Sequence, residues 1–249
     1  MSRPRLLNSL AAACLLLATA GPAAADRIQV AVASNFTGTL DRLAEHFERQ
    51  SGHQVVLVPG STGKHYAQIR NGAPFDAFFA ADVRRPELLE QEGAAVPGSR
   101  FTYAIGKLVL WSPAPGLVDS MGEVLKRGTY RHLAIANPRL APYGRAAREA
   151  LQAMELWQAL ERKLVYGESI GQTFLFVNSG NAELGLVAYA QVKDAGIDSG
   201  YWKIPSSLYA PIEQQAVALV DSAATRAFLA YVRSDEALGI IRGLGYDTP

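Results

Sequence analysis

The chain has 249 residues, a length that suits one large or two modest domains and allows a proper hydrophobic core. Hydrophobic residues make up 49% and charged residues 19% of it, so the composition is globular and excludes disorder or a coiled coil as the main content. Its 24 Lys and Arg nearly balance its 23 Asp and Glu, which argues against nucleic acid as a partner because proteins that bind it usually carry a basic excess.

The N-terminal segment has the three parts of a secretory signal peptide: two early arginines, an apolar run over 10–20 and a small-residue site that ends at Ala25. The apolar run is too short to cross roughly 30 Å of hydrocarbon. We therefore predict that residues 1–25 are removed by cleavage near Ala25, that the mature protein lies in the periplasm, and that it does not insert into the membrane. The single cysteine, Cys14, lies inside the apolar run, which disfavours the alternative of a lipid-modified N-terminus.

The first part of the mature chain alternates short apolar runs with segments of helical spacing. Runs rich in β-branched and aromatic residues predict strands at 28–33, 54–58 and 75–80. Helical spacing follows the first strand around 40–47, and a short helix is predicted after the second strand at 64–71. Strands that alternate with helices favour parallel crossover units, so the predicted class is α/β.

The pattern then restarts, and five further strands are predicted at 108–111, 133–136, 164–166, 185–189 and 213–220. Helices are predicted after the second and third of these strands, and two C-terminal helices are predicted from Ser222 and Asp235. No linker rich in Gly and Ser separates the two series. The sequence therefore predicts two α/β lobes joined by ordered chain.

Four turns share one layout, in which a strand ends, small polar residues or Gly and Pro follow, and a helix begins; they lie at 34–35, 61–63, 142–144 and 169–171. In a parallel α/β sheet such turns lie at the carboxyl ends of the strands, where ligands bind. Helix starts at that edge offer unpaired N–H groups that suit an anion, although the hydroxyl side chains would also serve as simple helix caps. Lys64 is the one cation beside these turns. Donors without a charge partner favour a fully deprotonated oxyanion.

Other chemistry has little support in the sequence. Residues 60–64 read GSTGK, but the first Gly of a P-loop would fall on Val58. The four histidines show no metal-binding spacing. We therefore predict that the protein is not an enzyme and holds no metal site.

Five blocks of the sequence are typical of one family; they read VAVASNFTGTLDRLAEHF, GSTGKHYAQIRNGAPFDAFFAAD, SRFTYAIGKLVLWSP, IANPRLAPYGRAAREAL and VNSGNAELGLVAYAQV. In this order and spacing they resemble the periplasmic molybdate-binding proteins of molybdate ABC importers, over essentially the whole mature chain. The resemblance implies a type II periplasmic binding protein with two lobes, each a mainly parallel sheet flanked by helices, and a ligand cleft between the lobes. It implies lobe I at 26–105 and 213–249, and lobe II at 106–212, with two strands that cross between them.

The resemblance also implies a function. It is capture of molybdate, and of tungstate, for delivery to the membrane permease of an ABC importer; a binding protein for another tetrahedral oxyanion, such as sulfate or thiosulfate, is the alternative. No cofactor and no metal is implied beyond the molybdenum of the ligand, and the protein is expected to be a monomer. Carried over by motif position, the ligand contacts fall on Ser34, Asn35, Thr62, Tyr143 and Ile170, with Ser61 as a further candidate.

Two positions depart from the pattern of the family. Thr62 stands where Ser is usual, which keeps the hydroxyl and adds a methyl group. Some relatives contact the ligand through a Tyr in the strand after the last ligand helix, where this chain has Ala188 beside Tyr189. The sequence leaves that contact open.

Overall fold

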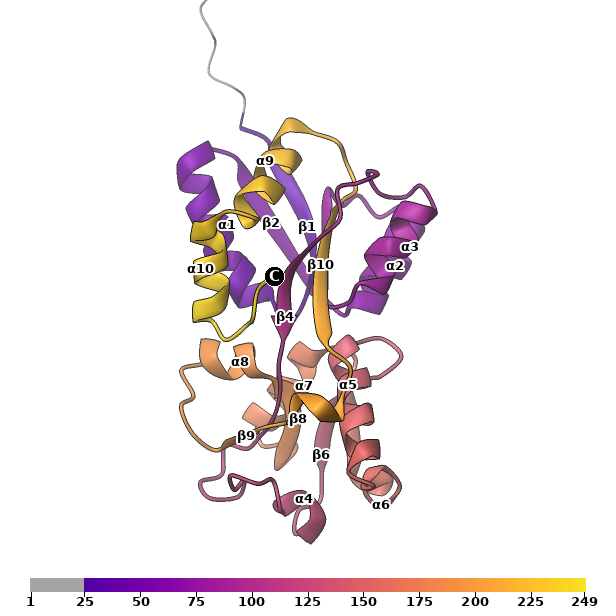
Figure 1. Ribbon diagram of the computed structural model, residues 1–249, viewed down its shortest axis with the longest axis vertical. Helices are drawn as coiled ribbons and strands as arrows, with labels where there is room; N and C mark the ends of the chain where they lie inside the picture. Colours follow the sequence, from indigo (N-terminus) through magenta and orange to yellow (C-terminus); the bar gives the residue numbers. More distant parts are fainter. Residues whose placement is uncertain (1–24) are drawn as a thin grey trace, which may run out of the picture.

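The computed structural model describes residues 25–249, so residues 1–24 of the predicted signal peptide, Cys14 included, lie outside the described residues. The described strands form two five-stranded sheets, one above the other in Figure 1. The first sheet has the order β2-β1-β3-β10-β4 and contains β1 (Arg27–Ala33), β2 (Gln54–Gly60), β3 (Ala77–Ala80), β4 (Phe101–Gly106) and β10 (Ile212–Ala218). The second has the order β7-β6-β8-β5-β9 and contains β5 (Leu108–Trp111), β6 (Leu133–Ala136), β7 (Leu164–Gly167), β8 (Leu184–Ala188) and β9 (Tyr201–Lys203).

Each sheet is mainly parallel, as predicted, with one reversed strand. In the first sheet β1 pairs in parallel with β2 and β3, whereas β10 is antiparallel to both β3 and β4. In the second sheet β6 pairs in parallel with β7 and β8, whereas β5 is antiparallel to both β8 and β9. The reversed strand is in each case the one that the chain enters directly from the other body, so the same topology is built twice.

Helices cover both faces of each sheet (Figure 1). One face of the first sheet packs against α1 (Thr37–Ser51), α9 (Ala223–Val232) and α10 (Asp235–Gly243), and the other face against α2 (Thr62–Arg70) and α3 (Arg84–Gln91). The second sheet packs α4 (Val124–Arg127) and α5 (Pro142–Ala153) on one face and α7 (Ile170–Asn178) and α8 (Tyr189–Asp194) on the other, and α6 (Trp157–Leu160) follows α5. Strands covered on both faces need apolar side chains on both, which explains their continuous apolar runs.

Helix α1 shows how the sequence sets these elements. Its buried residues Leu40, Leu43 and Phe47 recur at helical spacing and face the first sheet. The helix ends where Gly52 adopts a left-handed conformation with φ of 75° and donates its N–H to the carbonyl of Glu48 at 2.9 Å. Glycine suits this position because it has no Cβ to oppose a positive φ.

The chain passes between the two bodies twice. Strand β4 ends at Gly106 in the first sheet, and after the single residue Lys107 the chain forms β5 of the second sheet. It returns after β9 into β10, which lies beside β4 (Figure 1). These crossing segments are the elements about which one body could move against the other.

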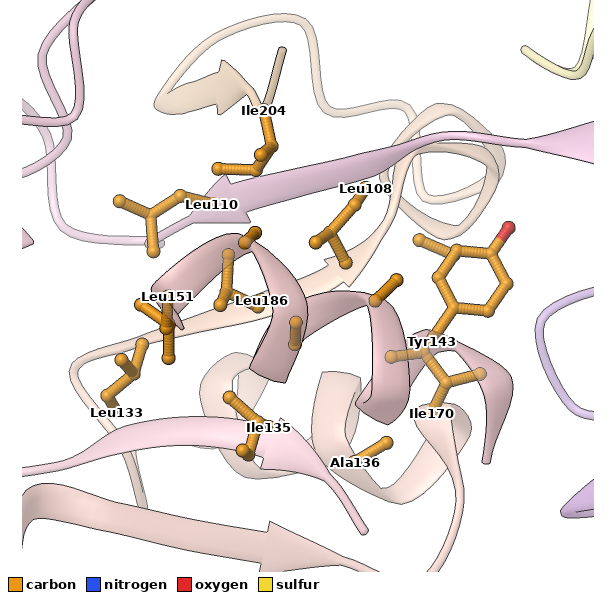
Figure 2. Packing of buried hydrophobic residues seen from close by; sticks show 14 of the residues in the cluster. Leu108, Leu110, Leu133, Ile135, Ala136, Tyr143, Leu151, Ile170, Leu186 and Ile204 are labelled. Carbon is orange, nitrogen blue, oxygen red and sulfur yellow. The ribbon is translucent and has the colours of Figure 1, made fainter. Parts of the chain in front are cut away.

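The largest cluster of buried residues fills the second body, where leucines and isoleucines of β5, β6 and β8 meet one face of α5 (Figure 2). Tyr143 and Ile170 belong to this cluster, with 1% and 3% of their surfaces exposed. Figure 2 shows both at its edge, with the Tyr143 hydroxyl pointing away from the leucines. The core therefore holds the starts of α5 and α7 in place.

The structure differs from the predicted elements at several boundaries. The helix predicted from residue 64 begins at Thr62, because the Ser61 side chain caps it. The strand predicted at 75–80 begins at Ala77, the strand predicted at 213–220 is β10, and the strand predicted at 185–189 ends one residue early, so that Tyr189 starts α8. Strands β4 and β9 and helices α3, α4, α6 and α8 were not predicted. No described helix is both long and apolar enough to span a bilayer.

Candidate functional site

The four predicted turns meet at one small cavity between the two bodies. Its lining includes every residue predicted to bind a ligand, and consists of Ala33, Ser34, Asn35, Gly60, Ser61, Thr62, Ala81, Ala141, Pro142, Tyr143 and Ile170. The first two turns follow β1 and β2 in the first sheet, and the other two follow β6 and β7 in the second. The cavity has a volume of about 10 Å³, comparable to the space of a single water molecule.

Each of the four turns brings to this cavity a backbone N–H group that has no hydrogen-bond acceptor within residues 25–249. One from each turn is that of Asn35, Thr62, Tyr143 and Ile170, at or just before the first turn of a helix, where N–H groups lack intrahelical partners. The next residue along the chain is paired in every case: the N–H groups of Phe36, Gly63 and Gly144 donate to carbonyls, and that of Gly171 donates to Ser34. Buried N–H groups are rarely left without an acceptor, so four together indicate a site for an acceptor-rich ligand.

Three hydroxyl groups at the cavity are arranged to donate as well. The Ser34 Oγ accepts from the Gly171 N–H at 3.0 Å, and the Thr62 Oγ1 accepts from the Ala81 N–H at 3.0 Å. The Ser61 Oγ accepts from the Lys64 N–H at 3.4 Å as the cap of α2. Because a hydroxyl both donates and accepts, each keeps its own hydrogen available for an acceptor in the cavity.

The lining carries no acidic or basic side chain. Lys64 lies outside it, 3.9 Å from Glu168 in a pair whose side chains are 59% and 74% exposed. Burial raises the pKa of the Tyr143 phenol well above its usual value, so this group stays neutral at physiological pH. The positive potential of the site therefore comes from peptide dipoles at the starts of α2, α5 and α7.

The two bodies touch directly around the cavity. Besides the bond from Gly171 to Ser34, the Gly63 N–H donates to the Leu140 carbonyl at 2.8 Å. A Cβ on Gly63 would lie 2.9 Å from that carbonyl oxygen, so this close approach requires glycine. Farther out, Arg42 on α1 pairs with Asp194 on α8 at 2.8 Å. These contacts hold the bodies together over the cavity.

The side chain of Asn35, a residue predicted to contact the ligand, is hydrogen-bonded within the protein. Its amide nitrogen donates to Gln214 at 2.7 Å and to the Tyr246 hydroxyl at 3.1 Å, so its backbone N–H is the group that remains for a ligand. Both of these partners were missed by the sequence analysis. They are 179 and 211 residues away along the chain, and no local pattern marks them.

Neither Ala188 nor Tyr189, the positions at which the sequence left a ligand contact open, lines the cavity. The Tyr189 ring lies 5.6 Å from the Tyr201 ring, and the Lys203 ammonium lies over it at 4.2 Å. Tyr189 therefore packs against Tyr201 and Lys203 rather than in the cavity. Across residues 25–249 the structure contains no group of His, Cys, Asp and Glu that could hold a metal ion.

Comparison with known proteins places the chain in a family. Residues 28–247 match the family model described as bacterial extracellular solute-binding protein. The chain is 50% identical to the molybdate-binding protein ModA of Azotobacter vinelandii and 46% identical to that of Rhodobacter capsulatus, in each case over 98% of both chains. The solved periplasmic molybdate-binding protein of Azotobacter vinelandii superimposes with a TM-score of 0.85 at 45% identity, over 89% of this chain and 99% of that chain.

Proposed function

This chain belongs to the bacterial extracellular solute-binding proteins, and we propose that it captures molybdate, and also tungstate, for the permease of an ABC importer. The observation that carries the proposal is the convergence of four unpaired N–H groups and three donor hydroxyls on one uncharged cavity. The names of the two relatives support molybdate as the ligand. The lining carries no acidic or basic side chain that could act as a general acid or base in a reaction.

The donor set suits a fully deprotonated dianion. Molybdate and tungstate carry acceptor oxygens only at neutral pH, so every oxygen can accept from an N–H or O–H group. Phosphate keeps a proton at that pH, and its hydroxyl would need an acceptor that no Asp or Glu in the lining supplies.

The proposal also includes two lobes and a hinge between them. Residues 26–105 and 213–249 form one lobe and residues 106–212 the other, and the lobes close over the ion by bending at 104–107 and 212–215. The direct passage from β4 to β5 and the pairing of β10 with β4 support this hinge. Cleavage near Ala25 releases the protein into the periplasm, where it works as a monomer.

The test is identification of the ion that the purified protein retains, together with calorimetric titration of ion-free protein. We expect molybdenum or tungsten in the retained ligand, and tight binding of molybdate and tungstate with at least a hundredfold weaker binding of sulfate and phosphate. Preferential binding of sulfate or thiosulfate would favour the alternative ligand class. No binding of any tetrahedral oxyanion would refute the proposal.

A further inference from the structure

Gln214 occupies a special position on the crossing strand β10. Its side chain is completely buried, although glutamine side chains are mostly exposed in folded proteins. The pairing of β10 with β4 shifts register between Gln214 and Gln215, so that Gln214 pairs with Ala104 and Gln215 with Thr102. Such bulges change the direction of side chains.

The Gln214 amide bonds to residues of both bodies. Its Oε1 accepts from the Asn35 amide at 2.7 Å and from the Tyr103 hydroxyl at 3.2 Å. Its Nε2 donates to the Tyr143 hydroxyl at 3.4 Å. The Tyr246 hydroxyl completes the group, since it donates to the Asn35 carbonyl at 2.7 Å. We refer to Asn35, Tyr103, Tyr143, Gln214 and Tyr246 as the Gln214 network.

Two members of the Gln214 network also supply unpaired N–H groups to the cavity. Asn35 follows β1 in the first body, and Tyr143 lies in α5 of the second. The amide of Gln214 is thus attached to one N–H donor residue on each side of the cavity. Gly106, at the end of β4, makes the connection possible, because a Cβ there would overlap with the Tyr143 hydroxyl.

We propose that Gln214 is a positioning residue for the ligand: it does not touch the ion but holds the N–H donors of Asn35 and Tyr143 at the spacing that the ion requires. This inference rests on the proposed function. The crossing strand moves when the lobes bend, so Gln214 couples the hinge to the donor set. Its two bonds to the first body and one to the second form together only when the lobes are closed.

A neutral amide suits this role in two ways. It donates and accepts at the same time, which a carboxylate or an apolar side chain cannot do. It also adds no negative charge beside a site for a dianion. The titratable groups that face it are the phenols of Tyr103 on β4, Tyr143 on α5 and Tyr246 near the C-terminus, and burial raises the pKa of all three. The charge of Asp82 acts on Tyr103, and Asp82 forms a salt bridge with Arg85.

The experiment compares Gln214→Glu with Gln215→Glu, a matched control on the same strand. Gln215 bonds to Thr102 and Arg100 instead, at 3.0 and 2.8 Å, and does not line the cavity. Molybdate affinity is measured by calorimetry at pH 9 and pH 6, with the melting temperature of each ion-free protein alongside. We expect Gln214→Glu to bind at least tenfold more weakly than the parent at pH 9. It should recover most of that loss at pH 6, because burial at this position raises the pKa of the introduced carboxyl and its protonated form donates again. Gln215→Glu should stay within threefold of the parent at both pH values.

A second variant covers the case in which Gln214→Glu does not fold. Gln214→Met has a similar volume, carries no charge and forms none of the three bonds, so it should bind at least tenfold more weakly at both pH values. The inference is overturned if the parent binds molybdate and either Gln214 variant binds as tightly as Gln215→Glu at pH 9, or if the loss in Gln214→Glu does not depend on pH. Failure of the parent to bind would instead refute the proposed function.

Discussion

The hydroxyl of Thr62 offers the sharpest test of how the cavity recognises an anion. This side chain is 1% exposed, and its Oγ1 accepts from the Ala81 N–H at 3.0 Å, which leaves its hydrogen to donate to the ligand. Thr62→Ala removes one hydrogen bond to a charged acceptor, worth about 1.5–3 kcal/mol. We expect the affinity for molybdate to fall roughly ten- to a hundredfold, since about 1.4 kcal/mol corresponds to a factor of ten.

The same substitution leaves the buried Ala81 N–H without its acceptor. The ion-free protein should therefore lose about 1–3 kcal/mol of unfolding free energy, which appears as a lower melting temperature. Thr62→Ser keeps the hydroxyl and should stay within about threefold of the parent in affinity, a shift of under roughly 0.7 kcal/mol.

Ile170→Val is the second control, because Ile170 has only its backbone N–H to offer and that group is unchanged. Calorimetric titration of the four proteins with molybdate measures the contrast. Thr62→Ala binding as tightly as the parent, or Ile170→Val binding more weakly than Thr62→Ala, would refute the assignment of side-chain and backbone donors.

Three further predictions concern the whole molecule. Molybdate at a hundred times its dissociation constant should stabilise the protein by about 2.7 kcal/mol, which raises the melting temperature by roughly 5–10 °C and reduces the radius of gyration in solution scattering; unchanged curves would contradict lobe closure. Burial alone would raise the pKa of Glu183, but hydrogen bonds from the His132 N–H and from Arg131 outweigh it and lower the pKa to about 2. Glu183→Gln should therefore lower the melting temperature above about pH 4.5, with a difference from the parent that shrinks as the pH falls toward 2; a difference independent of pH would disprove this. The periplasmic protein should have the intact mass of a chain that starts at Asp26, and a mass that retains Met1 or a lipid on Cys14 would exclude this cleavage.

The parts of the fold that could be predicted are those that local pattern determines. Apolar runs followed by Ser, Gly or Pro gave the strands β1, β2, β6 and β7 and the turns after them, because burial on both faces and helix capping act within a few residues. Strand β4 was missed: its sequence FTYAIG mixes apolar and small residues, and its pairing with β10 joins segments more than 100 residues apart.

The residues of the site also fall into those that a local sequence pattern predicts and those that it does not. Hydroxyls and helix starts next to the cavity could be found because each turn carries its own signal. The Gln214 network could not, because its bonds span 71 to 211 residues of sequence and depend on a register shift between β10 and β4. A buried glutamine in a predicted strand gives no indication of which turns it will meet.

The uncharged lining of the cavity determines whether protons are taken up or released when an anion binds. A site that neutralises its ligand with a histidine or lysine commonly takes up or releases protons during loading. Here the one ionisable side chain in the lining is Tyr143, and burial raises the pKa of its phenol well above the physiological range. With a dianion bound, the proton count of the site stays the same and the protein becomes more negative by two charges. Loaded and unloaded forms therefore differ in electrostatic potential as well as in shape, and a membrane partner could distinguish them by both.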